Sequence, residues 1–440
     1  MSAVLPNIAF AVIFFGLVGL FVRNIRRIIR NIKLGTAVSR SDQPKKRWLH
    51  MAKIALGQSK MVRKPISGLL HVVVYIGFVV INIELLEIVV DGFLGTHRIF
   101  APYLGAAYNV LIFTFEVFAL LVLVSVFFFW TRRNVVRIKR FWKSEMSGWP
   151  KLDADIILYA EVVLMGLFLT MNAADFWLQT NDAVYPTVGS YPISQFLLPI
   201  FDGMETSQVI AIERTAWWLH ITGILLFLNY LYYSKHLHIL LAFPNTYFAK
   251  LTPQGKLPNM ASITDEVKLM LDPNADPYAN PNGDNPPNTF GAADVTDLNW
   301  VQLMNAYSCT ECGRCTAVCP ANLTGKKLSP RKIMMDTRDR LTEVGQSINK
   351  GVAINDNVLL ENYVTKEELW ACTSCNACVE ACPIAIDPLS IIMDMRRYLV
   401  MEQSAAPTEL NNMMTNVENN GAPWPFNQQD RIAWREEINT

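Results

Sequence analysis

Two copies of one cysteine spacing constrain this chain more than any other feature of its sequence. All 8 cysteines of the 440 residues lie in the pattern C-x2-C-x2-C-x3-C-P, which occurs twice. The two copies contain Cys309, Cys312, Cys315 and Cys319, and then Cys372, Cys375, Cys378 and Cys382. The pattern is the ligand run of paired [4Fe–4S] clusters. The alternatives are disulfides, which do not repeat a four-cysteine spacing in a reducing compartment, and structural zinc sites, which have no use for a proline after the last cysteine.

The fourth cysteine of each run is expected to bind the cluster of the other run. One cluster is therefore assigned to Cys309, Cys312, Cys315 and Cys382. The second cluster is assigned to Cys372, Cys375, Cys378 and Cys319. Thiolates that serve clusters need a reducing compartment.

Long apolar runs occur only in the first 245 residues. A membrane-spanning helix needs about 20 apolar residues. Five runs supply them, namely Leu5–Val22, Gly68–Val90, Ala106–Trp130, Asp155–Trp177 and Arg214–Ala242. The sequence therefore predicts a five-helix transmembrane domain over residues 1–245. The histidines described below predict that this domain binds haem b. The formal net charge of +1 does not favour nucleic acid as a partner.

Basic residues are distributed unequally between the loops that join these runs. The loop 23–64 carries 13 Lys or Arg and the loop 132–151 carries 7, whereas 91–104 carries one and 178–213 carries none. Because basic loops stay in the cytoplasm, the N-terminus is predicted outside and the cysteine-rich part inside. We therefore expect a multi-pass protein of the cell (inner) membrane with a cytoplasmic cluster domain.

The sequence after the last apolar run divides into three parts, and strand signals are scarce. Residues 246–298 are rich in Pro, Asn and Asp and are expected to be a linker. Residues 299–403 are expected to form an α-helical ferredoxin domain with two [4Fe–4S] clusters, which makes the fold class all-α. Residues 404–440 are expected to be a partner-docking tail, irregular from Pro407 onward. Short helices are expected at Ile193–Ile200, Pro330–Leu341, Lys366–Trp370 and Pro388–Gln403.

Four of the 6 histidines lie in predicted spans. His71 begins the second span and His238 lies near the end of the fifth, so both are expected at the cytoplasmic end. Two imidazoles at one depth on two helices can hold a b-type haem. The alternative is a set of interfacial histidines that reach the lipid headgroups, although ionisable groups in a bilayer are usually functional. His50, in a basic loop, is expected to be solvated.

His220 lies eighteen residues earlier on the fifth span, which is roughly 27 Å along a continuous helix. Three interpretations stay open for it. It could hold a second haem with His97. It could line a quinone headgroup with Glu84, Glu87 or Glu116, which would carry protons. It could also be a histidine that hydrogen-bonds a neighbour.

These motifs resemble known families. The segments Leu69-Leu70-His71, Trp218-Leu219-His220 and Lys235-His236-Leu237-His238-Ile239 resemble the membrane haem b subunit of respiratory nitrate reductase, and the heterodisulfide reductase membrane subunit is similar. The run Cys309-Thr-Glu-Cys312-Gly-Arg-Cys315 resembles the helical ferredoxin of heterodisulfide reductase. By this resemblance His71 and His238 bind the haem nearest the cytoplasm. Ile81 stands where the family has another second-span histidine, so one haem b is expected and two are the alternative.

The expected function is that of a membrane-anchored electron-transfer subunit of a respiratory oxidoreductase. Electrons would pass between a cytoplasmic partner, two [4Fe–4S] clusters, haem b and membrane quinone. Similar oxidoreductases carry a cysteine-rich domain with CCG motifs, but no CCG occurs here and no G-x-G-x-x-G lies in a strand–helix setting. We therefore expect a separate CCG-type cysteine-rich or flavoprotein subunit. The alternatives are a non-catalytic membrane anchor with a docking ferredoxin module, and a redox sensor or assembly factor.

Overall fold

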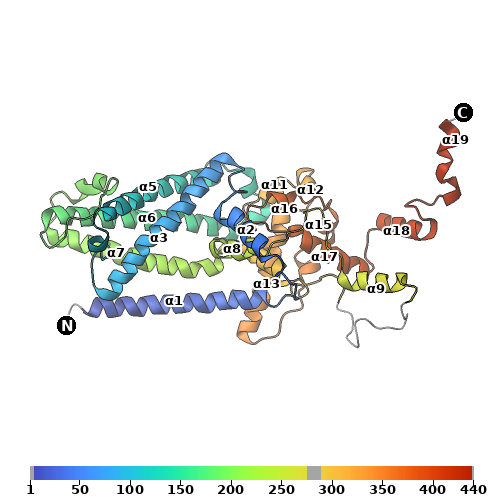
Figure 1. The fold of residues 1–440 in the computed structure, drawn as a ribbon, viewed down its shortest axis with the longest axis horizontal. Helices are drawn as coiled ribbons and strands as arrows, with labels where there is room; N and C mark the ends of the chain where they lie inside the picture. Colours follow the sequence, from blue (N-terminus) through green and yellow to red (C-terminus); the bar gives the residue numbers. More distant parts are fainter. Residues whose placement is uncertain (1–3, 275–288, 439–440) are drawn as a thin grey trace.

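The protein is helical throughout the part of the chain that the structure, a computed structural model, describes: residues 4–274 and 289–438. Within these residues there is no β-sheet, and only two isolated bridges occur, Thr36 with Asn299 and Leu360 with Val364. Long helices lie at one end of the molecule and a domain of short helices at the other (Figure 1). The predicted helical class is confirmed.

Five helices are long and apolar enough to cross a membrane. They are α1 (Val4–Ile32), α3 (Pro65–Leu94), α5 (Ala106–Asn134), α6 (Trp149–Asn181) and α7 (Thr206–Tyr230). Many of their large apolar side chains, such as those of Phe15 and Phe127, remain exposed on the outside of the bundle. Exposed apolar surface of this extent on long helices is typical of helices that contact lipid. The prediction of five apolar spans is confirmed, and this is a membrane protein.

The fifth predicted span, Arg214–Ala242, is not one helix, and this part of the prediction is wrong. The α-helix ends at Tyr230 and is followed by two 3-10 turns, η5 (Leu231–Tyr233) and η6 (Lys235–Leu237), before α8 (His238–Tyr247). Ser234 is extended and its side chain accepts a hydrogen bond from the backbone N–H of His236. The helical hydrogen-bond pattern is therefore interrupted, and the distance estimated from His220 along a continuous helix does not apply.

The cysteine-rich part forms a domain of short helices. These are α10 (Trp300–Ser308), α11 (Arg314–Ala317), α12 (Pro320–Leu323), α13 (Pro330–Lys350), α14 (Leu359–Asn362), α15 (Lys366–Trp370), α16 (Ala377–Ala381) and α17 (Pro388–Met401). Prolines stand at the first positions of α12, α13 and α17, where their missing N–H is not needed. Helix α15 has the predicted bounds, α17 ends two residues early, and α13 continues well beyond Leu341.

The other elements that precede the C-terminal tail are short. They are α2 (Pro44–Met51), the π-helix η1 (Ala52–Leu56), α4 (Ala101–Leu104), η2 (Lys139–Phe141), η3 (Ser144–Met146), η4 (Ser194–Phe201) and α9 (Ala261–Leu271). A helix was predicted near Ile193–Ile200, and η4 occupies that place as a 3-10 helix. The expected linker, residues 246–298, contains the end of α8 and α9, and its residues 275–288 lie outside the described residues.

The cluster domain packs directly on one end of the membrane bundle. Ile28 of α1 and Leu237 belong to the same buried apolar core as Leu303 of α10. Across this junction the side chain of Asn31 donates a hydrogen bond of 2.9 Å to the hydroxyl of buried Tyr307. Because burial removes apolar surface from water, a shared core of this kind holds the two parts in one arrangement.

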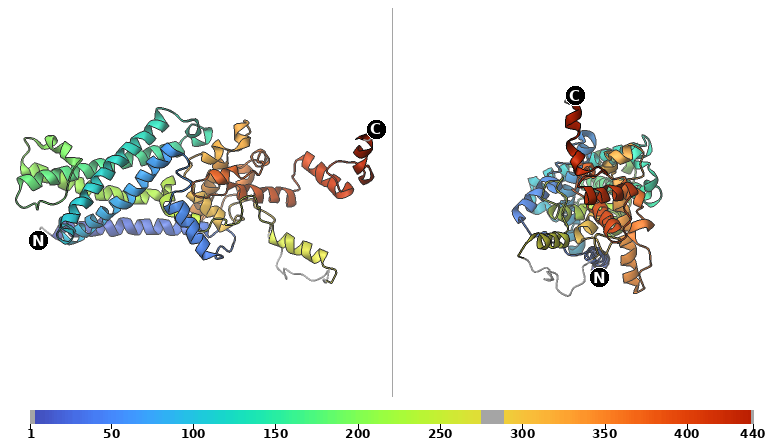
Figure 2. Two further views of the ribbon diagram at one scale, coloured as in Figure 1. Left: turned by 45° about the horizontal axis from the view of Figure 1, so that its top comes forward. Right: turned by 90° about the vertical axis from the view of Figure 1, so that its right-hand side faces the viewer.

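The C-terminal tail projects away from the cluster domain (Figure 2). It contains α18 (Thr408–Asn420), η7 (Gln428–Ile432) and α19 (Trp434–Ile438). Neither α18 nor α19 buries any residue. The expectation of an irregular tail from Pro407 is therefore wrong for these helices.

Replacing Leu303 tests the shared core. We expect Leu303→Ala to destabilise the junction by about 2–5 kcal/mol, because the side chain is fully buried and its removal leaves a cavity. Thermal unfolding and protease sensitivity of the purified protein measure the effect. Leu323→Ala is the control, since that side chain is 69% exposed. Equal losses in the two variants would contradict the shared core.

Candidate metal centre

Both cysteine motifs have the same unusual backbone conformation. Cys309 follows α10, and the next loop places Glu311 and Gly313 at φ 54° and 70° before α11 begins. A side chain at Gly313 would meet Nη1 of Arg331 at 2.5 Å. Glycine satisfies both requirements at this position, because it adopts positive φ at no steric cost and leaves room for the guanidinium.

The second motif repeats this shape at the equivalent positions. Ser374 and Asn376 have φ 56° and 60°, and α16 then carries Cys378. Asparagine is among the residues that tolerate this left-handed region. Helices α11 and α16 pack against each other, so the two motifs face one another across the domain.

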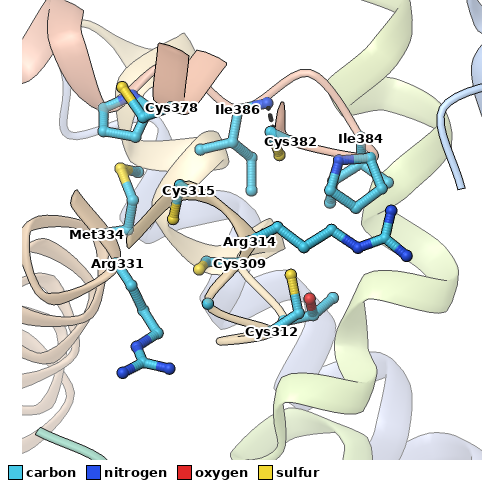
Figure 3. Close-up of a pocket in the computed structure, with 14 residues that line it drawn as sticks. Cys309, Cys312, Arg314, Cys315, Arg331, Met334, Cys378, Cys382, Ile384 and Ile386 are labelled. Carbon is cyan, nitrogen blue, oxygen red and sulfur yellow. Dashed lines mark hydrogen bonds between the residues drawn. The ribbon is translucent and has the colours of Figure 1, made fainter. Parts of the chain in front are cut away.

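One pocket collects cysteines from both motifs (Figure 3). It is lined by Cys309, Cys312, Cys315, Cys378 and Cys382, with apolar walls from Met334, Pro383, Ile384 and Ile386. Its lining therefore includes the three leading cysteines of the first motif and the last cysteine of the second. The last cysteine of the first motif likewise lies near the second motif. Cys319 is close enough to Cys372 and Cys378 for their charges to interact.

All eight cysteines are free of disulfides in the structure. Burial raises the pKa of the Cys309 thiol to about 12 and that of Cys382 to about 11. Such thiols stay protonated at neutral pH, and ligation to a metal is what favours their thiolate form. Among the described residues no three His, Cys, Asp or Glu side chains meet in the geometry of a single metal ion.

Backbone N–H groups already point at sulfur, from Ile386 to Cys382 at 3.3 Å and from Ser374 to Cys372 at 3.4 Å. Hydrogen bonds to cluster sulfurs tune reduction potentials.

A buried ion bridge connects the first cysteine loop to the membrane bundle. Glu311, which lies between Cys309 and Cys312, forms ion pairs with Nζ of Lys235 and, at 2.6 Å, with Nη1 of Arg338. Burial would raise the pKa of Glu311, but the charges of Arg338 and Lys235 outweigh it and lower this pKa below its ordinary value. The sequence alone does not indicate this bridge, because it joins residues far apart in the chain.

Three histidines lie near one another, two of them in the segment that follows Lys235. The ring centroids of His236 and His238 are 5.5 Å apart, and His71 is close enough to both for their charges to interact. Nδ1 of His71 is buried and has no hydrogen-bond partner among the described residues. The structure thus brings together the predicted pair, His71 and His238, and adds His236. His50 is half-buried, not solvated as expected, and its Nδ1 lies 2.8 Å from the carbonyl of Thr246.

His220 lies apart from these histidines. It is buried, and its Nδ1 is 3.0 Å from the carbonyl oxygen of Leu164. His97 is engaged elsewhere, because its Nε2 lies 3.0 Å from Oδ1 of Asp175. If His220 is a histidine that only hydrogen-bonds a neighbour, that neighbour is Leu164.

Comparison with known proteins bears first on the cysteine domain. A family model described as a 4Fe-4S dicluster domain matches residues 308–386. The chain contains a 4Fe-4S dicluster domain. The match begins one residue before Cys309 and ends after Cys382, so it covers both motifs.

Several relatives of this chain are oxidoreductases or oxidoreductase subunits. A probable iron–sulfur-binding oxidoreductase, FadF of Bacillus subtilis, is 28% identical over 95% of this chain and 59% of its own length. The EtfAB:quinone oxidoreductase of Syntrophomonas wolfei is 26% identical over 91% of this chain and 55% of its own length. One subunit of the dihydromethanophenazine:CoB–CoM heterodisulfide reductase of Methanosarcina acetivorans is 27% identical over 32% of this chain and 35% of its own length.

This chain thus spans a little over half the length of the first two relatives. No solved structure matches it. The homologues support an electron-transfer iron–sulfur subunit.

Replacing Glu311 tests the ion bridge. We expect Glu311→Gln to lower the free energy of unfolding by about 3–5 kcal/mol, because it removes the nearest counter-charge of two largely buried cations, Lys235 and Arg338. Thermal unfolding of the purified protein measures this. Glu367→Gln is the matched control, since Glu367 pairs with Lys327 on the surface and both side chains are exposed. A Glu311→Gln protein as stable as the control would contradict the bridge.

Proposed function

We propose that the chain is the membrane-anchored, quinone-interacting electron-transfer subunit of a respiratory oxidoreductase. It passes electrons between a cytoplasmic partner, two [4Fe–4S] clusters, haem b and membrane quinone. The observation that carries the proposal is the direct junction of two potential cofactor sites. The bridge joins Glu311, which lies between two cysteines of the pocket, to Lys235, which precedes His236 in the chain, and both segments contribute to one apolar core. The cofactors supply one-electron chemistry, and the protein supplies their position and tuning.

We base the assignment of cysteines to the two clusters on the residues that line the pocket. We assign Cys309, Cys312, Cys315 and Cys382 to the cluster nearer the membrane, and Cys372, Cys375, Cys378 and Cys319 to the other. Cys375 is the one exposed cysteine among the described residues, which supports the second cluster as the point of contact with the partner. The buried Cys309 adjoins the bridge to the bundle, which supports the first cluster as the one next to the haem.

We propose that His71 and His238 would hold haem b, which would supply one-electron chemistry when bound. An imidazole that binds a metal usually donates its other ring N–H to a protein oxygen. Nδ1 of His238 lies 3.1 Å from the carbonyl of Lys235, which leaves Nε2 for a metal. The buried, unpartnered ring nitrogen of His71 also fits a ligand role. We propose one haem b and assign His220 to the quinone side of the bundle.

The proposed topology places the N-terminus outside and the cluster domain in the cytoplasm. Both basic loops contact the cluster domain, which supports their location on one side of the membrane. Lys60 and Arg63 pair with Glu380, and Nη1 of Arg331 donates a hydrogen bond of 2.6 Å to the carbonyl of Arg140. Hydrogen bonds from Arg63 and Gln254 lower the pKa of Glu380 to about 2, so the carboxylate is charged at neutral pH. The positive-inside rule then assigns this side to the cytoplasm.

Residues 404–440 are proposed to dock a CCG-type cysteine-rich or flavoprotein subunit. The tail projects from the domain and exposes apolar side chains, namely Met413, Met414, Val417, Trp424 and Phe426. Aromatic residues and methionine are enriched at protein interfaces. The name of the Syntrophomonas relative, EtfAB:quinone oxidoreductase, supports a protein donor on one side and a quinone on the other.

Optical spectroscopy tests the function against its alternatives. We expect a b-type band in the dithionite-reduced protein that disappears on addition of a quinone analogue. A membrane anchor without catalytic function would show no such reoxidation. A protein that lacks the band altogether would contradict the haem assignment.

Replacing Cys315 tests the clusters. We expect about eight cluster irons per chain in the wild type, since each of two clusters contains four. Cys315→Ser should remove or convert one cluster and stop electron delivery to the haem, while the membrane part still inserts. Iron analysis and EPR spectra measure the outcome. Ser374→Ala is the control, because it changes a residue between two ligands and keeps every thiolate. Retention of both cluster signals in Cys315→Ser would contradict the assignment.

Replacing histidines tests the haem. His71→Ala and His238→Ala should each abolish the same b-type haem, because an axial pair fails when either member is lost. His50→Ala and His236→Ala should retain it, although His236 lies beside His238. Haem quantification against protein decides, with one haem per chain expected in the wild type. Loss of haem in His236→Ala but not in His238→Ala would show that the ligand is the neighbouring histidine.

A further inference from the structure

A buried polar network occupies the end of the membrane bundle distal to the cluster domain. It joins the C-terminal halves of α3 and α6 to α5 and to the two loops at this end. Its members are Glu84, Glu87, His97, Arg98, Tyr108, Glu116, Asn172, Asp175, Gln179, Tyr191 and Ser194. Asp91 and the pair of Glu213 with Arg214 lie at its edge. Ionisable groups inside a membrane are costly and usually functional.

Arg98 is the central cation of this network. Its guanidinium lies 3.1 Å from Oε1 of Glu84, 3.1 Å from Oδ2 of Asp175 and 2.7 Å from Oδ1 of Asn172. Arginine keeps its charge at every physiological pH. Arg98 can therefore neutralise one of the two carboxyl groups that share it, but not both.

Asp175 is better placed than Glu84 to be the carboxylate that the charge of Arg98 compensates. Besides Arg98, its carboxylate lies 3.0 Å from Nε2 of His97 and accepts hydrogen bonds from Tyr191 at 3.1 Å and Gln179 at 3.3 Å. A carboxylate with several hydrogen-bond donors is favoured in its charged form.

Glu116 and Glu87 are also surrounded by donors. Glu116 accepts hydrogen bonds from the backbone N–H groups of Ile193 and Ser194 at 2.9 and 3.0 Å, from the Ser194 hydroxyl, and from the Asn172 amide. Glu87 accepts hydrogen bonds from the N–H of Phe100 and the hydroxyl of Tyr108, at 2.9 and 2.8 Å respectively.

Glu84 differs from the other three carboxyl groups. Its side chain is 1% exposed, and its one hydrogen-bond partner among the described residues is Arg98. Its second oxygen, Oε2, is buried and has no partner there. Even if His97 is charged, the four acids outnumber the two cations by two, so two of the acids must be neutral or be stabilised by hydrogen-bond donors alone. Glu84 has the fewest hydrogen-bond donors of the four carboxyl groups, and it shares its one cation with Asp175.

We propose that Glu84 is held in its protonated form inside the bundle and donates this proton to a carbonyl oxygen of the membrane quinone. The use of the proton rests on the proposed function; the protonated state does not. Two electrons reach the quinone from the subunit's cofactors. The O–H bond of Glu84 breaks as an O–H bond forms on one carbonyl oxygen, and a second proton from the distal aqueous side completes the quinol. The carboxylate left behind faces Arg98, which stabilises it until Glu84 is protonated again.

Infrared spectroscopy of the full chain in lipid nanodiscs tests the protonated state. We expect a carboxylic C=O stretching band in the wild type that shifts in D2O and is lost in Glu84→Gln. In Glu84→Asp the band should shift instead of disappearing, which keeps the test valid if Glu84→Gln does not fold. Glu116→Gln is the matched control and should retain the band. Persistence of the band in Glu84→Gln, or its loss only in Glu116→Gln, would overturn the assignment.

Thermal unfolding gives an independent readout. Glutamine has nearly the shape of a protonated glutamate, so Glu84→Gln should melt at the wild-type temperature. Asp175→Asn should melt at a clearly lower temperature, because it removes an anion that pairs with Arg98. If Glu84→Gln melts as low as Asp175→Asn, Glu84 is an anion in the wild type and the proposal fails.

Quinone-analogue turnover then tests the donor role. We expect Glu84→Gln to lose most of its turnover while its cluster and haem spectra are unchanged. Loss of the infrared band with full turnover would overturn the donor role. If the wild type itself does not reoxidise with a quinone analogue, the proposed function fails, and the infrared and melting results still decide the state of Glu84.

Discussion

The buried bridge between Glu311 and Lys235 is the contact on which the arrangement of this protein depends. A carboxylate in the loop that carries the first cysteines meets an ammonium group of the segment that carries His236 and His238. Because both groups are buried, separating them would leave each charge in the interior without its nearest partner. The ion pair therefore favours the arrangement in which the two segments are in contact. The surrounding core, shared by α1 and α10, excludes water from this contact and orients the short helices of the cluster domain.

The two ends of the membrane bundle use charge differently. At the end that contacts the cluster domain, the carboxylate of Glu311 lies between two cations and is fully compensated. At the distal end Arg98 is shared by Glu84 and Asp175, and acids outnumber cations. A compensated bridge stabilises a structure, whereas a deficit of positive charge requires a proton to be held. The first arrangement suits the joining of two domains, and the second suits proton chemistry inside a membrane.

Local patterns in the sequence predicted much of the fold. Five apolar runs predicted five long helices, because the length of a membrane-spanning helix is set by the thickness of the bilayer. The predicted bounds of α15 agree with the structure, in which Thr365 and Glu368 form a capping box at its start. The prediction was wrong where a tertiary contact overrides a local preference. The fifth span breaks after Tyr230, and Asp153 on another helix accepts hydrogen bonds from the hydroxyl of Tyr230 and the backbone N–H of Lys235.

By itself the sequence determined the chemistry available to this protein: eight thiols in two cluster spacings, and histidines at the ends of apolar runs. Covalent spacing is a local property, so it can be read directly from the chain. Only the tertiary structure decided which of these groups meet. It put Cys382 in the pocket of the first motif, His236 beside His238, Lys235 against Glu311, and Arg98 between two carboxyl groups. These contacts join residues distant in the chain, and they depend on how whole helices pack.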